Sequence, residues 1–206
     1  MRREWLQEHH ALEAHYWWFV NKRRMVRALL DAARPGGNRL LEVGCGGGRM
    51  SATLHDAGWD VVATDLQLDG ARYARQRGVR KCLLHHAGHN WPFAGESFDT
   101  ALLLDVLEHI EDDAHALGEL RRVLRPGGYA IVAVPAYGCL FSSWDTRNGH
   151  YRRYTARGLA AVARRAGFTV ARRTYWNAVS LPPALVLRLA DRLRAPRRDE
   201  IHYPRV

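Results

Sequence analysis

From residue 39 onward, short apolar runs rich in β-branched residues alternate with longer segments whose apolar positions recur at a helical period. This alternation is typical of parallel strands that are joined by crossover helices. It predicts an α/β fold with a doubly wound, mostly parallel sheet. The predicted strands span residues 39–44, 60–65, 80–85, 98–106, 129–135 and 168–176, and the predicted helices span 48–57, 70–77, 112–124 and 155–166.

The segment before this core is also predicted to be helical. Apolar residues recur near a 3.6-residue period from Val20 to Leu30, and a Pro-Gly-Gly stop follows at 35–37. We expect residues 1–37 to form a helical cover or lid, which packs on an α/β core over residues 38–180.

Residues 181–206 are predicted to form a C-terminal helix and tail. The helix would span 181–194, start at Pro182-Pro183 and carry arginines on one side. Such a helix either covers a sheet edge or makes weak contact with an anionic membrane surface, and the sequence leaves both open. Residues 201–206 are the one candidate for a seventh strand.

Composition narrows the class of protein. A length of 206 residues fits one domain, and no apolar run approaches the roughly 20 residues that a bilayer crossing needs. The N-terminus lacks the apolar core of a signal peptide. The cysteines Cys45, Cys82 and Cys139 are widely separated and match neither a disulfide framework nor a zinc motif. These features predict a cytoplasmic protein, either monomeric or homodimeric.

The net charge of +10 invites a nucleic-acid partner, because clustered basic residues attract phosphate. The basic residues are instead spread along predicted helix surfaces. Only Lys22 and Lys81 are lysines, as happens when coding bias sets the choice of basic residue. The pattern therefore disfavours nucleic acid and favours solvated helix faces.

A glycine loop, Gly44-Cys45-Gly46-Gly47-Gly48, follows the first predicted strand and precedes a helix. Glycine is needed where the chain turns sharply and where a cofactor approaches the main chain. A tight turn without a ligand is the alternative. A dinucleotide site is weaker, because Arg49 takes the place of the third glycine in that fingerprint. Asp65 ends the second strand, where a carboxylate either binds ribose hydroxyls or caps a helix.

Three further segments carry a resemblance to a known family. They are Trp91-Pro92-Phe93 with Ser97-Phe98-Asp99, then Asp105-Val106-Leu107-Glu108-His109-Ile110, and then Leu120 to Gly128 with the pattern L-x-R-V-L-x-P-G-G. Together with the loop and Asp65, they resemble class I S-adenosylmethionine-dependent methyltransferases over residues 38–176. The resemblance implies a Rossmann-like methyltransferase fold and S-adenosylmethionine as cofactor, with S-adenosylhomocysteine as product. The cofactor residues that it implies are Glu42, Gly44, Cys45, Gly46, Asp65, Leu66, Gly88 and Asp105.

One position departs from the family pattern. The family usually has an acid before the LPF-like segment to meet the adenine amino group, whereas this chain has His86-Ala87-Gly88-His89. Backbone groups or His89 are the substitutes available for the adenine.

Candidate catalytic residues follow the fourth and fifth strands, since ligands bind at the carboxyl ends of strands in such sheets. His150 is the preferred general base, and His109 is the second catalytic candidate. A metal is the alternative: Asp105, Glu108 and His109 with His150 resemble the motif of ubiquinone-pathway O-methyltransferases and small-RNA terminal methyltransferases. That set would hold a Mg²⁺-like ion and lower the pKa of an acceptor hydroxyl. In many relatives the same string is purely structural.

The segment 144–154 is too polar and aromatic for a core strand and is expected to cover the acceptor pocket. It resembles a subfamily that pairs an H-x-R-R-Y string with an N-terminal His-aromatic run at 15–19. Docking of the helix is an equal explanation for that run. The predicted substrate residues are Tyr16, Trp17, Trp144, Arg152, Arg153 and Tyr154.

The function expected from these features is methylation of a small-molecule acceptor, with oxygen favoured over nitrogen. Quinones or phenols, sugars and secondary metabolites are the acceptor classes considered. RNA methylation and a cofactor-binding partner protein without catalysis are the alternatives. Fold by itself does not decide among them.

Overall fold

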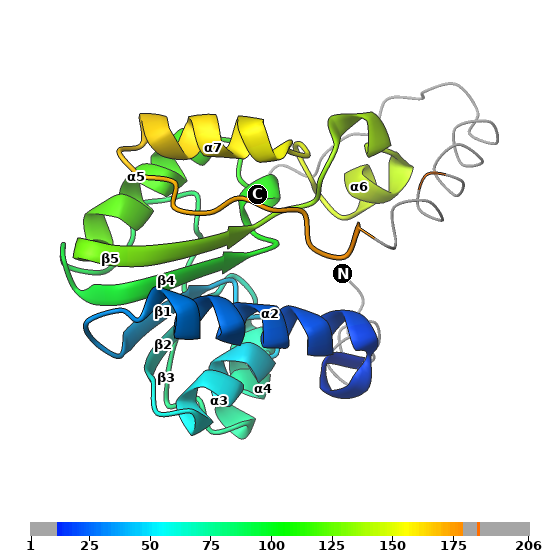
Figure 1. Cartoon of the computed structure of the whole chain (residues 1–206). Helices are drawn as coiled ribbons and strands as arrows, with labels where there is room; N and C mark the ends of the chain where they lie inside the picture. Colours follow the sequence, from blue (N-terminus) through cyan, green and yellow to red (C-terminus); the bar gives the residue numbers. More distant parts are fainter. Residues whose placement is uncertain (1–11, 179–184, 186–206) are drawn as a thin grey trace.

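The computed structural model describes residues 12–178 and 185 (Figure 1). Its centre is a five-stranded sheet in the order β3-β2-β1-β4-β5, and every neighbouring pair is parallel. The strand order reverses between β1 and β4, which is the switch point at which such sheets bind ligands. The predicted doubly wound fold is therefore confirmed. The strands are β1 (Arg39–Val43), β2 (Asp60–Asp65), β3 (Lys81–Leu84), β4 (Phe98–Leu104) and β5 (Leu124–Ala133).

The central strands are buried on both faces. The side chains of Leu40 and Leu41 in β1 are fully buried, and so are those at 101–103 in β4. The register sets Leu41 level with Val62 of β2 and with Ala101 of β4. Continuous apolar runs of this kind are required where helices cover both faces of a parallel sheet.

Two layers of helices cover the sheet (Figure 1). Leu40 and Leu102 pack with the helices of one layer, whereas Leu41 and Leu103 pack with those of the other, because successive strand residues point to opposite faces. The first layer holds α2 (Trp17–Ala33), α3 (Arg49–Asp56) and α4 (Leu68–Gln76), and the second holds α5 (Asp113–Val123) and α7 (Ala156–Arg165). The short elements η1 (Leu107–His109), η2 (Gly138–Leu140) and α6 (Ser143–Arg147) follow β4 and β5. None of the helices in the described part of the chain has the length and apolar character that a bilayer crossing needs.

The predicted N-terminal helix is present as α2 and packs directly on the sheet. Val26 and Leu30 are buried in the same cluster as Leu40. The helix ends at Arg34, whose φ of 46° turns the chain just before Pro35. The bounds of the cover (1–37) and of the core (38–180) stay predictions. The predicted helix 181–194, apart from Leu185, and the candidate strand 201–206 lie outside the described residues.

Two strand predictions were wrong. Residues 168–176 form no strand. Side chains hold this segment instead: the ring of Tyr175 stacks on Tyr137 at a centroid distance of 4.9 Å, and Trp176 packs on Trp18 at 4.5 Å. β5 begins at Leu124 rather than at residue 129, because Leu124 already pairs with Phe98 of β4, before a register irregularity between Phe98 and Thr100. The strand propensity of a segment does not show whether a neighbouring strand is available to pair with it.

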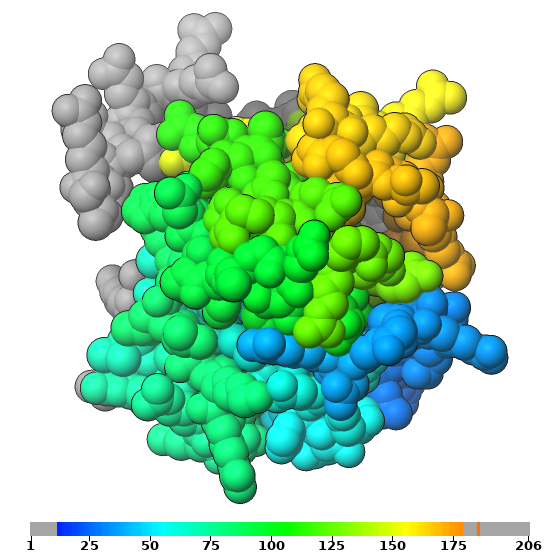
Figure 2. Space-filling model, turned by 90° about the vertical axis from the view of Figure 1, so that its left-hand side faces the viewer, coloured from blue at the N-terminus to red at the C-terminus, as the bar shows by residue number. Residues whose placement is uncertain are grey.

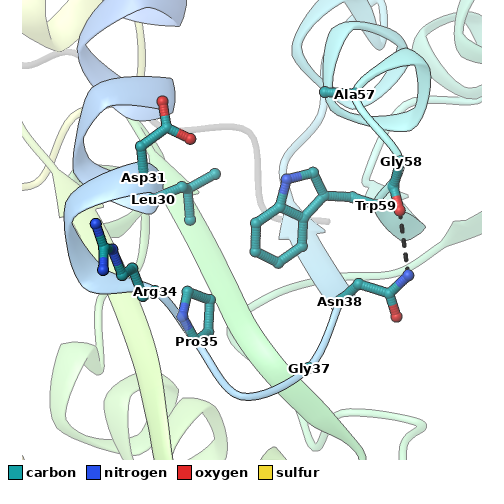
Figure 3. Close-up of a pocket in the computed structure, with 9 residues that line it drawn as sticks. All are labelled: Leu30, Asp31, Arg34, Pro35, Gly37, Asn38, Ala57, Gly58 and Trp59. Atoms are coloured by element: carbon teal, nitrogen blue, oxygen red, sulfur yellow. Dashed lines mark hydrogen bonds between the residues drawn. The ribbon is translucent and has the colours of Figure 1, made fainter.

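A cavity of about 360 Å³ lies between the end of α2 and the turn after α3 (Figure 3). Leu30, Arg34, Asn38 and Trp59 are among the residues that line it. It opens at the amino ends of β1 and β2, on the side of the molecule that faces the viewer in Figure 2. Ligands of doubly wound sheets bind at the opposite edge, so the candidate site lies elsewhere.

Candidate active site

The glycine loop, residues 44–48, leaves the carboxyl end of β1 at the switch point. Gly44, Gly46 and Gly48 have φ angles of 72°, 54° and 73°, in the left-handed region that favours glycine. A Cβ atom on Gly48 would lie 2.6 Å from the Cα atom of Ala74. The absence of a side chain at Gly48 therefore lets α4 pack closely against the loop.

Asp65 stands at the carboxyl end of β2, beside the loop. Its Oδ2 accepts a hydrogen bond from the amide of Gly46 at 2.7 Å, and its Oδ1 accepts one from the amide of Gln67 at 2.8 Å. The neighbouring Leu66 is 63% exposed. A carboxylate held in this way can accept the two hydroxyls of a ribose, with an apolar side chain next to it for a base.

Glu42 lies beneath the loop with a buried carboxyl group. Ser51 of α3 donates its hydroxyl hydrogen to Oε2 of this group. Burial, reinforced by the negative charges of Glu13 and Asp65, raises the pKa of Glu42 to about 8. The carboxyl is therefore protonated at neutral pH when the site holds no ligand.

Two of the predicted cofactor residues lie nearby with their side chains or amides already engaged. The side chain of Cys45 is buried in a cluster with Cys82, and its amide donates to the carbonyl of Thr64 at 2.9 Å. Gly88 follows β3, and its amide donates to Nδ1 of His86 at 3.1 Å. The rings of His86 and His89 stack at 4.3 Å.

The segment before α2 adds a residue that the sequence analysis missed. The carboxylate of Glu13 is buried on the glycine loop and accepts a hydrogen bond from the amide of Gly47 at 3.2 Å. Arg77 pairs with the same carboxylate, and Arg23 donates to the carbonyl of Glu13 at 2.5 Å. No local motif marks Glu13, because its contacts span 34 and 64 positions of sequence.

The tip of β4 brings Asp105 to the same edge. Asp105 has a φ of 57°, and its carboxylate forms an ion pair with the buried ammonium of Lys22 from α2. The predicted substrate residues Tyr16 and Trp17 are 43% and 46% exposed. Trp18 and Lys22 of α2, one helical turn apart, reach the site. Counting back along α2 in steps of four from the buried residues Leu30 and Val26 leads to Lys22 and then to Trp18, so the helical period could have indicated both.

His150 is the best-organised reactive group at this edge. Its Nδ1 lies 2.9 Å from Oδ1 of Asp145, and that oxygen also accepts from Nε of Arg153 at 2.7 Å. Ser142 donates its amide to Oδ2 of Asp145 at 2.9 Å, within the capping box that starts α6. Burial would raise the pKa of Asp145, but the hydrogen bonds from Arg153 and Ser142 lower it below its ordinary value. An ionised Asp145 orients Nδ1–H of His150 toward itself and leaves Nε2 as a proton acceptor.

Glu108 and His109 lie against His150. One ligand atom from each of these three residues lies within 4.8 Å of the others, and the His109 and His150 rings meet edge to face at 4.6 Å. Glu108 is fully buried, and neither carboxyl oxygen has a hydrogen-bond partner among the described residues. Burial and the charge of Asp105 raise the pKa of Glu108 to about 8. Burial and His150 lower the pKa of His109.

The remaining predicted substrate residues make internal contacts. Arg152 pairs with Asp113 at 3.0 Å, and the hydroxyl of Tyr154 donates to the same carboxylate at 2.8 Å. Arg153 is bound to Asp145, as described above. Trp144 is 44% exposed and stands edge to face against His150 at 5.4 Å. The structure thus brings Trp144 and Arg153 to the site, and it uses Arg152 and Tyr154 to fasten the loop to α5.

Comparison with known proteins assigns the family. Residues 16–172 match the model of a family described as "Methyltransferase domain". The chain is 32% identical over 182 residues to a demethylmenaquinone methyltransferase of Renibacterium salmoninarum, covering 87% of this chain and 69% of that protein. It is 37% identical over 109 residues to a ubiquinone biosynthesis O-methyltransferase of Ruegeria pomeroyi, covering 50% of this chain and 44% of that protein.

A solved structure agrees with these matches. It is a SAM-dependent methyltransferase of Thermotoga maritima, described as a possible histamine N-methyltransferase, with 28% identity and a TM-score of 0.60. The superposition covers 80% of this chain and 81% of that one. The chain therefore belongs to the methyltransferase domain family, and it is a class I S-adenosylmethionine-dependent methyltransferase.

Proposed function

We propose that the protein methylates an oxygen of a small aromatic acceptor of the phenol or quinol class. The observation that carries the proposal is the buried Asp145–His150 pair at the carboxyl edge of the sheet, where a base is needed if the acceptor must lose a proton. The names of the relatives support the acceptor class, since they refer to demethylmenaquinone and to ubiquinone biosynthesis. The chain spans only 44% of the ubiquinone-related protein, so that protein's full activity is not carried over.

The residues around the glycine loop fit S-adenosylmethionine. A Cβ atom on Gly44 would lie 2.4 Å from Cγ2 of Val106, so the loop can adopt this conformation only with glycine at position 44. Asp65 would bind the ribose, Leu66 would flank the adenine, and Glu42 with the loop backbone would face the methionine end. When bound, the cofactor supplies an electrophilic methyl group to the acceptor. Alignment of the reacting atoms is the main contribution that the protein makes to such a displacement.

His150 supplies the proton chemistry. Nε2 of His150 takes the proton from the acceptor hydroxyl, and the charge that this creates on the imidazole is stabilised by Asp145. Burial of both groups excludes water from the pair. Arg153 keeps Asp145 ionised and in place, so that the imidazole does not rotate.

We expect an Asp65→Ala substitution to weaken binding of S-adenosylhomocysteine by about 10- to 100-fold, because hydrogen bonds to a charged group contribute about 1.5–3 kcal/mol. Isothermal titration calorimetry measures this directly. The matched control is Asp69→Ala, which removes an acid of α4 that pairs with Arg72 at the surface. Equal affinity of the Asp65→Ala variant and the wild type would refute the cofactor site.

A separate assay tests which class of acceptor the protein methylates. Purified protein with S-adenosylmethionine is offered matched panels of quinols, phenols, sugars and short RNA, and mass spectrometry detects the added methyl group. We expect methylation of the aromatic hydroxyl panel. Methylation confined to sugars or to RNA would contradict the proposal.

A metal-assisted reaction is the second candidate, because the buried Glu108 carboxyl lacks a hydrogen bond and lies beside His109 and His150. One carboxylate and two imidazoles suit a first-row transition ion better than magnesium, which prefers oxygen ligands. Asp105 is paired with Lys22 and lies outside this group. We expect turnover to survive dialysis against EDTA and to ignore added Mg²⁺. Loss of turnover on chelation, with recovery on Mn²⁺ or Zn²⁺, would favour the metal.

We also infer a reducing, cytoplasmic setting. The buried cysteines Cys45 and Cys82 are free thiols in the structure. Free thiols persist where glutathione and thioredoxin keep them reduced.

A further inference from the structure

Lys22 occupies an unusual position for a lysine. It lies on α2 one turn before Val26, on the stripe that packs against the sheet, and its side chain is only 9% exposed. The ammonium is carried to the carboxyl edge of the sheet, where it pairs with Asp105 at the tip of β4. Lysine is rarely buried without a specific partner.

Three aromatic rings surround the same ammonium. Nζ of Lys22 lies 5.6 Å from the ring centroid of Trp18, 6.0 Å from that of Phe19 and 5.9 Å from that of Trp176. Ring faces attract a cation and replace part of its hydration. The ammonium is thus held in a partly dry pocket that one carboxylate and three rings line.

The pocket belongs to the same site as His150. Asp105 lies at the tip of β4, three residues before Glu108 of η1, so the ammonium that pairs with Asp105 lies at the same end of β4 as Glu108. Glu108 in turn lies beside His150. A cation and a proton acceptor therefore lie at the same edge of the sheet.

Lysine is an unusual residue type at this position of this chain. The chain has 31 basic residues and only two lysines, so arginine is its default cation. An ammonium is a compact point charge on a flexible stem, whereas a guanidinium is broad, planar and suited to fixed bidentate pairs. Position 22 therefore suits a small cation that can shift between partners.

We propose that Lys22 is an acceptor-binding residue, whose ammonium turns from Asp105 to the anionic oxygen of a phenol or quinol. The inference rests on the proposed function and adds the group that stabilises the oxyanion. The acceptor O–H bond breaks, its proton goes to Nε2 of His150, and the electron pair stays on the oxygen beside Lys22. That pair then forms the C–O bond as the methyl C–S bond breaks, with the bonding pair leaving on sulfur. Lys22 thus stabilises the developing negative charge electrostatically, which is a role that a bound metal ion can also have in an enzyme.

The test uses 4-nitrocatechol, whose ionised form has a distinct visible absorption band. The probe is titrated across pH with protein saturated with S-adenosylhomocysteine. We expect the wild type to lower the apparent pKa of the bound probe by about one to three pH units, the effect of an opposite charge at close range. Lys22→Met should lose this shift and Lys22→Arg should retain part of it. The other charged or titratable groups grouped with Lys22 and His150 are Asp105, Glu108, His109, Asp145 and Arg153. These groups and His150 are unchanged in both variants.

Lys81→Met is the matched control, because it removes the other lysine, which pairs with Asp60 at the surface. It should retain the full spectral shift. Calorimetry with S-adenosylhomocysteine and thermal melting are run on each variant. A wild type that binds this nucleoside but shows no shift, or a folded Lys22→Met variant with the wild-type shift, overturns the inference and leaves the proposed function standing. Absence of nucleoside binding in the wild type refutes the proposed function itself.

Discussion

A His150→Gln variant is expected to bind S-adenosylhomocysteine normally while its kcat falls by about 10²- to 10⁴-fold, the range that general base catalysis contributes. Glutamine keeps a polar side chain of similar reach but cannot take a proton at neutral pH. In the proposed function His150 contacts the acceptor and not the glycine loop, so the affinity for the nucleoside should stay within a factor of about two. Single-turnover kinetics and calorimetry separate the two effects.

The same prediction extends to Asp145, the positioning residue. In Asp145→Asn the amide no longer attracts Nδ1–H of His150 or the guanidinium of Arg153, so the imidazole loses its orientation. We expect kcat to fall in the same direction with KM nearly unchanged, because the interaction matters most when the imidazole gains charge. Asp112→Asn is the control, since Asp112 caps α5 through the amide of His115 and asparagine caps equally well. Full turnover in His150→Gln would remove the base assignment.

A Glu42→Gln variant is expected to be more stable than the wild type at pH 8 and equally stable at pH 4. The pKa of Glu42 is raised from 4.5 to about 8, so the folded state binds a proton that the unfolded state releases between those values. The free energy of unfolding therefore falls as pH rises through this window. At about 1.4 kcal/mol for each pH unit, the loss is on the order of a few kcal/mol. Glutamine cannot ionise and still accepts the hydroxyl hydrogen of Ser51, so its curve should be flat in this window.

Urea denaturation without cofactor at several pH values from 4 to 8 measures the effect. Glu111→Gln, on an exposed side chain, controls for the loss of one surface charge. Parallel curves for the wild type and Glu42→Gln would contradict the burial argument. A variant that gains stability and loses nucleoside affinity would show that the buried carboxyl is kept for binding, at the expense of stability.

Local sequence determined the features that depend on backbone conformation and on burial. The glycine loop was predictable because three of its residues adopt positive φ angles that other residues rarely take. β1, β2 and β4 were predictable because both of their faces are buried, which requires continuous apolar runs. Asp65 followed from its place at the end of a strand next to that loop. The family resemblance then supplied the cofactor.

Tertiary structure decided which distant side chains meet. Lys22 reaches Asp105 across 83 positions and Glu13 reaches Gly47 across 34, and no local period encodes such pairs. The aromatic run at 16–19 could not reveal by itself that Trp18 faces the site while Trp17 is exposed, because the rotation of α2 is set by its packing on the sheet. The same holds for residues 168–176, where ring stacking on Tyr137 and Trp18 took the place of a strand. Contacts between distant segments depend on the geometry of the whole fold, and the sequence determines that geometry only through the packed core.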